Sequence, residues 1–123
     1  HLESIYSKCA LHEQVEIVRA MARIAGPRAP QFLRARLGES SEIRRVAARG
    51  LAGLADQTHL SLLVTLAGDT DWHIRVEAAR GLGRLHLAEC QEPLLTLARD
   101  VEPAVAAMAR EALALHRKVA PAA

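Results

Sequence analysis

Three stretches of this chain repeat one pattern and decide its fold. They read Ile43-Arg-Arg-Val-Ala-Ala-Arg-Gly-Leu-Ala-Gly-Leu54, Ile74-Arg-Val-Glu-Ala-Ala-Arg-Gly-Leu-Gly-Arg-Leu85 and Val105-Ala-Ala-Met-Ala-Arg-Glu-Ala-Leu-Ala-Leu-His116. Their first residues are numbered 43, 74 and 105, so each copy follows the previous one after 31 residues. A shorter fourth copy, offset by 30 residues, is Glu16-Ile-Val-Arg-Ala-Met-Ala-Arg-Ile24. Repetition with such a period is typical of proteins built from stacked repeats.

Each copy carries the apolar pattern of an amphipathic helix. In the first copy, an apolar face is formed by Ile43, Ala47, Leu51 and Leu54. A small residue stands before the Leu or Met of every copy, namely Gly50, Gly81, Ala112 and Ala20. Glycine inside a helix costs up to about 1 kcal/mol relative to alanine, so its recurrence at one repeat position needs a structural reason. We expect a neighbouring helix to approach closely there.

A shorter apolar segment precedes each of the three longer copies and is expected to form the first helix of a pair. These segments are Pro30–Leu37, His59–Leu66 and Gln91–Leu97, with Leu33, Leu63 and Leu94 at equivalent positions.

The turns within each pair carry their own signals. Gly38 and Gly68 are expected to end first helices in a left-handed conformation. Ser41 and Asp71 are expected to cap the N-termini of second helices. Pro103 suits the first turn of a helix, where a missing N–H leaves no hydrogen bond unmade.

Together these signals predict eight helices, at about residues 2–8, 11–25, 28–38, 41–55, 58–68, 71–87, 90–99 and 103–118. The predicted architecture is all-α: a right-handed α-solenoid of about four helix-pair repeats. It forms a single domain over residues 1–118, with repeats at about 1–25, 28–55, 58–87 and 90–118. Residues 119–123 are expected to form a disordered tail.

The composition agrees with this fold and limits the function classes. Half of the 123 residues are hydrophobic but only Tyr6, Phe32 and Trp72 are aromatic, which disfavours strand-rich folds. The net charge of +2 permits nucleic-acid binding without favouring it. Cys9 and Cys90 match no metal or redox spacing, and two free thiols suit a cytoplasmic protein. No apolar run is long enough to predict insertion into a membrane.

The stretch Asp71-Trp-His-Ile-Arg-Val-Glu-Ala-Ala-Arg-Gly-Leu-Gly-Arg-Leu85 resembles the HEAT-repeat family. More narrowly, it is similar to the short bacterial form that also occurs in phycobilisome-lyase-type repeats. The matching residues are Asp71, Ile74, Arg75, Ala78, Ala79, Leu82 and Gly83. The resemblance covers roughly residues 11–118. It implies a structural ladder in which Arg44 and Arg75 pair with turn acids such as Asp69, Asp71 or Asp100. Ala106 replaces the arginine in the last copy, as suits a capping repeat.

The second helices of HEAT repeats line an inner, concave face, and arginines recur on these helices. Arg19, Arg49 and Arg80 share one repeat position, and Arg23 and Arg84 share another position one turn on. Such rows are suited to an acidic protein surface or to phosphate, because the guanidinium is a fixed fork of donors. The alternative is a solvated face in which the arginines pair with neighbouring acids such as Glu16 and Glu77, and Glu111 interrupts the row.

Trp72 admits two interpretations, since it lies in the turn between two paired helices. An exposed indole there is a candidate anchor for a partner, whereas a packed one holds the turn against a neighbouring helix end.

Two catalytic resemblances have little support in these residues. The pair His12-Glu13 is similar to one iron-binding pair of HEAT-type deoxyhypusine hydroxylases, but the equivalent stretches read Glu42-Ile43 and His73-Ile74. Without repeated pairs there is no metal site. Attachment of a bilin would need a larger pocket than four short repeats suggest. The sequence therefore predicts no catalytic residue, metal or cofactor.

We expect a non-enzymatic protein–protein interaction module that binds an acidic protein partner through its arginine-bearing concave face. The alternatives are binding of a DNA or RNA backbone by the same face and a lyase-type or accessory enzyme role. A further alternative is self-association through the ends of the stack, since truncated solenoid ends expose apolar area.

Overall fold

The computed structural model describes residues 2–24 and 26–119, with side chains up to Leu115. The α-helices in this part of the chain are α1 (Leu2–Ser7), α2 (Leu11–Ile24), α3 (Ala29–Ala35), α4 (Ser41–Leu54), α5 (Leu60–Ala67), α6 (Trp72–Leu85), α7 (Gln91–Leu97) and α8 (Pro103–Val119). Short 3-10 helices η1 (Arg36–Gly38), η2 (Gln57–His59) and η3 (Ala88–Cys90) adjoin the first helices of three pairs. The all-α prediction is confirmed, and the predicted helices are found within a few residues of their expected ends. Val119 is the last residue of α8, and residues 120–123 of the predicted tail lie outside the described residues.

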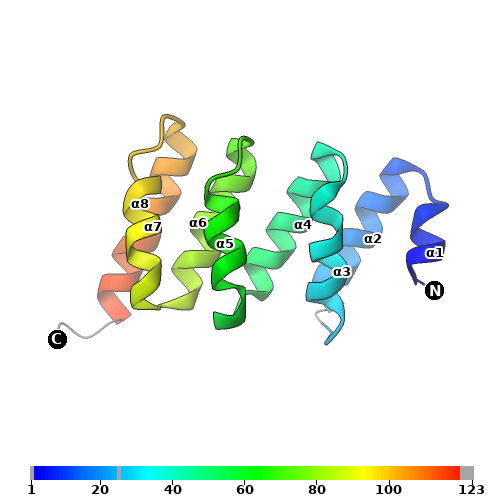
Figure 1. The fold of residues 1–123 in the computed structure, drawn as a ribbon, viewed down its shortest axis with the longest axis horizontal. Coiled ribbons are helices and arrows are strands. Elements are labelled where there is room, and N and C mark those ends of the chain that lie inside the picture. Colours follow the sequence, from blue (N-terminus) through cyan, green and yellow to red (C-terminus); the bar gives the residue numbers. More distant parts are fainter. Residues whose placement is uncertain (1, 25, 120–123) are drawn as a thin grey trace. The chain divides into compact units, whose positions relative to one another are not determined.

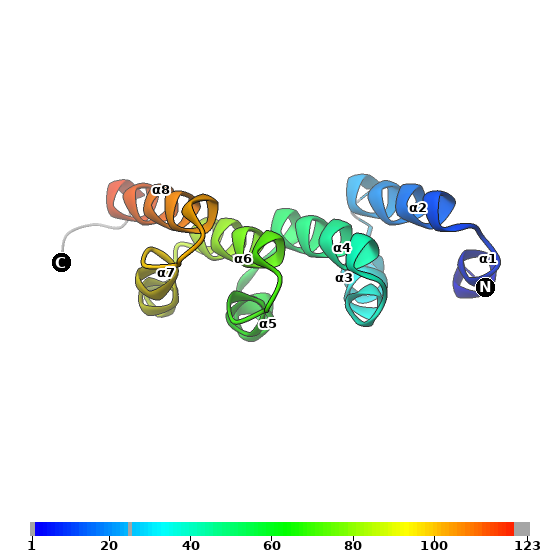
Figure 2. The same cartoon turned by 90° about the horizontal axis from the view of Figure 1, so that it is seen from above.

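The chain divides into two compact units, residues 1–54 and 55–123. In the first unit, α2 and α4 form one layer while α1 and α3 form the other (Figures 1 and 2). In the second unit, α6 and α8 form one layer while α5 and α7 form the other (Figure 2). Each unit therefore has the helix-pair arrangement that the repeats predict.

The repeated apolar positions are the core positions. Leu33, Leu63 and Leu94 of the first helices are completely buried. The faces of the second helices are buried at Ile43, Ala47, Leu51, Ile74, Ala78, Leu82, Val105 and Ala109. Burial of these aliphatic side chains is the main source of stability, because neither helix of a pair can cover its apolar stripe alone.

Small residues let neighbouring second helices approach closely. A Cβ atom added at Gly50 would lie 2.9 Å from the Cβ of Ala22 on α2 and 3.1 Å from Leu33 Cδ1. A Cβ atom added at Gly83 would lie 2.6 Å from the Cβ of Ala112 on α8. The recurrent small position, which includes Gly50 and Ala112, is therefore the place where one second helix meets another within each unit.

The predicted turn chemistry is only partly right. Among the described residues no glycine has a positive φ, so the left-handed caps expected at Gly38 and Gly68 are wrong. Gly38 instead ends η1, and Gly68 N–H donates to Thr65 O at 3.1 Å in a tight last turn. The left-handed residue is His86, with φ 53°, which follows α6.

One of the two expected N-caps is found. Asp71 caps α6, since its carboxylate accepts from His73 N–H at 3.0 Å. Ser41 is itself the first residue of α4, and Pro103 is the first residue of α8 as expected.

Candidate functional site

Three arginines gather on the exposed side of α2 and α4 in the first unit: Arg19, Arg23 and Arg49, called here the arginine patch. Arg23 and Arg49 are exposed and make no ion pair within the described part of the chain. Arg19 donates to Glu16 at 3.2 Å, in a pair whose side chains are 53% and 65% exposed. Such an exposed pair contributes little to stability, so the Arg19 guanidinium can still bind a partner.

The helix crossing explains why these arginines share one face. Arg23 follows Ala22, and Arg49 precedes Gly50, the two residues at which α2 and α4 come closest. Because α2 and α4 run in the same direction (Figure 1), these neighbours turn away from the crossing toward the same side. The patch therefore rests on two rigid helices and not on a loop.

The equivalent surface of the second unit is less basic. Arg80 pairs with Glu77 at 3.1 Å. Arg84 follows Gly83, while Glu111 precedes Ala112 at the facing position on α8, and both Arg84 and Glu111 are exposed. Positive and negative charge alternate here, so the two units differ in the charge that they present.

The arginine named by the family signature holds two turns of the second unit together. Arg75 donates from Nε to Asp100 Oδ2 at 2.8 Å and from Nη2 to Asp100 Oδ1 at 3.0 Å. Its Nη1 donates to Asp69 O at 2.8 Å, within the turn that precedes α6. The hydrogen bonds from Arg75 hold the pKa of Asp100 below its usual range. The structure thus brings Arg75 and Asp100 together as a structural pair.

The corresponding arginine of the first unit has a related backbone contact. Arg44 donates from Nε to Leu37 O at 2.8 Å, so it too ties the turn before its own helix. Asp71 accepts from the backbone and lies 3.0 Å from His73 Nδ1. Arg44 therefore stabilises the turn before α4, and Asp71 stabilises the turn before α6.

Trp72 is the first residue of α6 and lies partly in solvent, with 36% of its surface exposed. Its indole stacks on the ring of His73, with the ring centroids 3.7 Å apart. The indole therefore packs against the His73 ring while the residue as a whole stays partly exposed.

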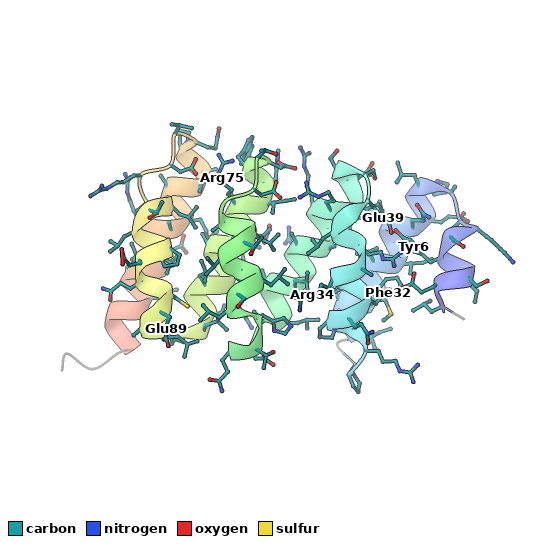
Figure 3. All side chains as sticks on the ribbon, in the orientation of Figure 1. Tyr6, Phe32, Arg34, Glu39, Arg75 and Glu89 are labelled. Carbon is teal, nitrogen blue, oxygen red and sulfur yellow. The ribbon has the colours of Figure 1, made fainter. Side chains whose placement is uncertain are left out.

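Sequence reasoning missed a polar and aromatic cluster in the first unit, built around Arg36. Figure 3 labels three of its members, Tyr6, Phe32 and Glu39. Arg36 is 6% exposed, pairs with Glu3 at 2.6 Å and Glu39 at 2.7 Å, and lies over the rings of Tyr6 and Phe32. The Tyr6 hydroxyl donates to Glu39 at 2.8 Å. Burial and the hydrogen bond to Glu39 raise the pKa of Tyr6. The cluster fastens α1 to the α3–η1 segment.

The remaining polar groups and the surface depression give no sign of a metal site or of a reactive nucleophile among the described residues. No group of three or more potential metal ligands occurs among the described residues. Glu13 Oε1 accepts from Ala10 N–H at 2.8 Å, so it caps the start of α2. A shallow depression over η3 and α7 is lined by Ala88, Glu89, Gln91, Glu92 and Leu95. Burial raises the pKa of the Cys90 thiol, which disfavours the reactive thiolate.

Within the described residues, no helix is both long enough and apolar enough to cross a membrane. A family model described as HEAT repeats matches residues 38–114, which is more than half of the chain. The match includes α4 to α8 almost completely. A comparison with curated proteins found no match.

Proposed function

Because this chain belongs to the HEAT-repeat family, we propose that it is a non-enzymatic protein-interaction module whose arginine patch binds an acidic protein segment. HEAT repeats generally mediate interactions between proteins, through surfaces formed by stacked helices. The observation that carries the proposal is the exposure of Arg19, Arg23 and Arg49 together on α2 and α4.

The chemistry of the patch favours carboxylates in a partner. Backbone groups in the middle of a helix are already hydrogen-bonded, so a helical surface offers its side chains. An arginine side chain presents five donors in a fixed fork that matches a carboxylate in two hydrogen bonds. Neither Arg23 nor Arg49 forms an ion pair within the described residues, so the donors of both guanidinium groups can bind a partner's carboxylates.

We expect Arg80 and Arg84 of the second unit to contribute less to binding an acidic segment than the arginine patch does. Glu77 already neutralises part of Arg80, and Glu111 would repel an acidic segment near Arg84. We therefore expect charge reversal at Arg80 and Arg84 to weaken binding less than charge reversal in the arginine patch.

The same guanidinium groups also suit phosphate, so DNA or RNA is the ligand class that an experiment has to separate from protein. A lyase-type role would be supported by a bound chromophore or metal, which absorption and metal analysis of the purified protein would reveal. We further propose a cytoplasmic location, which is supported by Cys9 and Cys90, both free thiols.

Affinity capture from native lysate tests this proposal, with bound proteins quantified by mass spectrometry. The bait is the wild type, the patch variant Arg19→Glu/Arg23→Glu/Arg49→Glu, or the matched variant Arg28→Glu/Arg34→Glu/Arg99→Glu. The matched variant makes the same charge change at exposed arginines outside the patch. We expect a protein that is captured by the wild type and the matched variant but not by the patch variant, and that resists nuclease. Recovery that nuclease abolishes would assign the patch to nucleic acid instead.

A further inference from the structure

The second unit has an exposed acidic surface along η3 and α7. One shallow depression there is lined by Ala88, Glu89, Gln91, Glu92 and Leu95, called here the α7 face. Glu89 and Glu92 are exposed, and neither forms an ion pair or a hydrogen bond within the described part of the chain. Figure 3 shows Glu89 at the end of α7 that follows η3. Both carboxylates are therefore available to a ligand.

Leu95 gives the α7 face an apolar part. Its side chain is 49% exposed, and it lies three residues after Glu92, so the two share one side of α7. Residues 88–98 contain no Lys or Arg, so no cation of this segment balances Glu89 and Glu92. An arginine suits such a surface, because its aliphatic stem packs on a leucine while its guanidinium meets a carboxylate. The α7 face thus has the chemistry to bind arginine side chains.

The chain carries exposed arginines in its other unit, in the arginine patch. The two units are also opposite in overall charge. Residues 1–54 contain nine Lys and Arg against five Asp and Glu, whereas residues 55–123 contain seven against nine. Their formal charges at neutral pH are +4 and −2. The first unit of one copy therefore attracts the second unit of another copy.

We propose that the arginine patch of one copy binds the α7 face of a second copy. The guanidinium groups of the patch meet Glu89 and Glu92, and an arginine stem packs on Leu95. This inference rests on the proposed function, because it names the acidic segment that the patch binds. A patch that is bound to a second copy is closed to other acidic partners, so self-association limits access to them.

Sedimentation velocity of the full chain over a range of concentrations tests this contact. The wild type is expected to self-associate at low ionic strength and to become monomeric as salt is added, because salt screens exposed charges. The patch-neutral variant is Arg19→Gln/Arg23→Gln/Arg49→Gln, and the α7-neutral variant is Glu89→Gln/Glu92→Gln. Each removes the charge from one side of the contact and should weaken self-association at least about tenfold.

Two matched variants make the same charge changes elsewhere. Arg28→Gln/Arg34→Gln/Arg99→Gln neutralises three exposed arginines outside the patch. Glu102→Gln/Glu111→Gln neutralises two acids outside the α7 face. Both matched variants should self-associate within about threefold of the wild type, since isolated surface charges contribute little.

Mixing the two neutral variants gives the sharpest result, because neither is expected to associate with itself. The patch-neutral variant keeps the carboxylates of its α7 face, and the α7-neutral variant keeps its arginine patch. The mixture should therefore form complexes that contain both variants. A chain with both sets of substitutions should not associate with the patch-neutral variant, because neither protein then has an arginine patch.

A wild type that stays monomeric at low salt would overturn the proposal, and so would a mixture of the two neutral variants that does not associate. Losses in the matched variants equal to those in the neutral variants would also overturn it. Binding of a glutamate-rich peptide to the wild type distinguishes this failure from failure of the proposed function. If the patch binds the peptide while the wild type stays monomeric, only self-association is wrong. If the peptide does not bind either, the proposed function is wrong as well.

Discussion

Asp100 accepts two hydrogen bonds from the guanidinium of Arg75, at 2.8 and 3.0 Å, and a third from Glu102 N–H at 2.9 Å. One carboxylate thereby organises its own turn and joins it to the preceding repeat of the second unit. The side chains of Arg75 and Asp100 are only 17% and 12% exposed, so water replaces these hydrogen bonds poorly.

Asp100→Asn is therefore expected to destabilise the protein by about 2 kcal/mol, since it leaves the Arg75 guanidinium with a neutral partner in a mostly buried position. Urea unfolding measures this loss. Glu92→Gln, at an exposed acid of α7, is the control and should change stability by less than about 0.5 kcal/mol. Equal stability of Asp100→Asn and the control would show that the pair contributes nothing.

The same pair predicts a dependence on pH. The folded-state pKa of Asp100 is lowered, mainly by the hydrogen bonds from Arg75. Stability from this shift is fully present above the ordinary aspartate pKa of 3.8 and is lost as pH falls through the folded-state value. The unfolding midpoints of wild type and Asp100→Asn should therefore differ constantly above about pH 5 and converge in more acidic solution. A difference that persists unchanged at the lowest pH would contradict this assignment.

Two glycines of α4 predict opposite effects of one substitution. A Cβ atom at Gly53 meets nothing within 4 Å, so Gly53→Ala should stabilise the protein by about 0.5 kcal/mol through helix propensity. A Cβ atom at Gly50 meets Ala22 at 2.9 Å and Leu33 at 3.1 Å, so Gly50→Ala should destabilise it by about 1–2 kcal/mol. Thermal or urea unfolding of the two variants checks the signs. Stabilisation by both substitutions would mean that the α2–α4 crossing has room to relax.

The buried Arg36 predicts local unfolding of α1. Arg36→Leu removes the ion pairs with Glu3 and Glu39, so α1 should exchange its amide hydrogens much faster than α6 and α8. Tyr6→Phe removes one hydrogen bond, so it should lower the free energy of opening α1 by a smaller amount, about 1 kcal/mol. Hydrogen exchange followed by mass spectrometry resolves these segments. Unchanged protection of α1 in Arg36→Leu would show that apolar contacts alone hold the helix.

The helices could be predicted from the sequence because each of them repeats one apolar stripe. The 31-residue offset places Ile43, Ile74 and Val105 at one core position, and all three are buried. The conformations at helix ends could not be predicted in this way. They depend on local hydrogen bonds, such as Asp56 N–H donating to His59 Nδ1 at 3.1 Å, which begins η2.

The candidate surfaces were predictable to different degrees. The arginines of the patch recur at fixed repeat positions, so their shared face follows from periodicity. The Arg36 cluster does not recur, and it joins Tyr6 to Glu39 across 33 residues of sequence. The i, i+4 spacing of Phe32 and Arg36 was its only local signal.

Equilibrium binding of a dye-labelled, glutamate-rich peptide tests the central claim most directly. Fluorescence anisotropy compares the wild type with Arg19→Glu/Arg23→Glu/Arg49→Glu and with the matched variant Arg28→Glu/Arg34→Glu/Arg99→Glu. The claim predicts that the patch variant loses at least about tenfold in affinity while the matched variant stays within about threefold of the wild type. Equal losses in the two variants, or no measurable binding by the wild type, would contradict an acidic-segment site on α2 and α4.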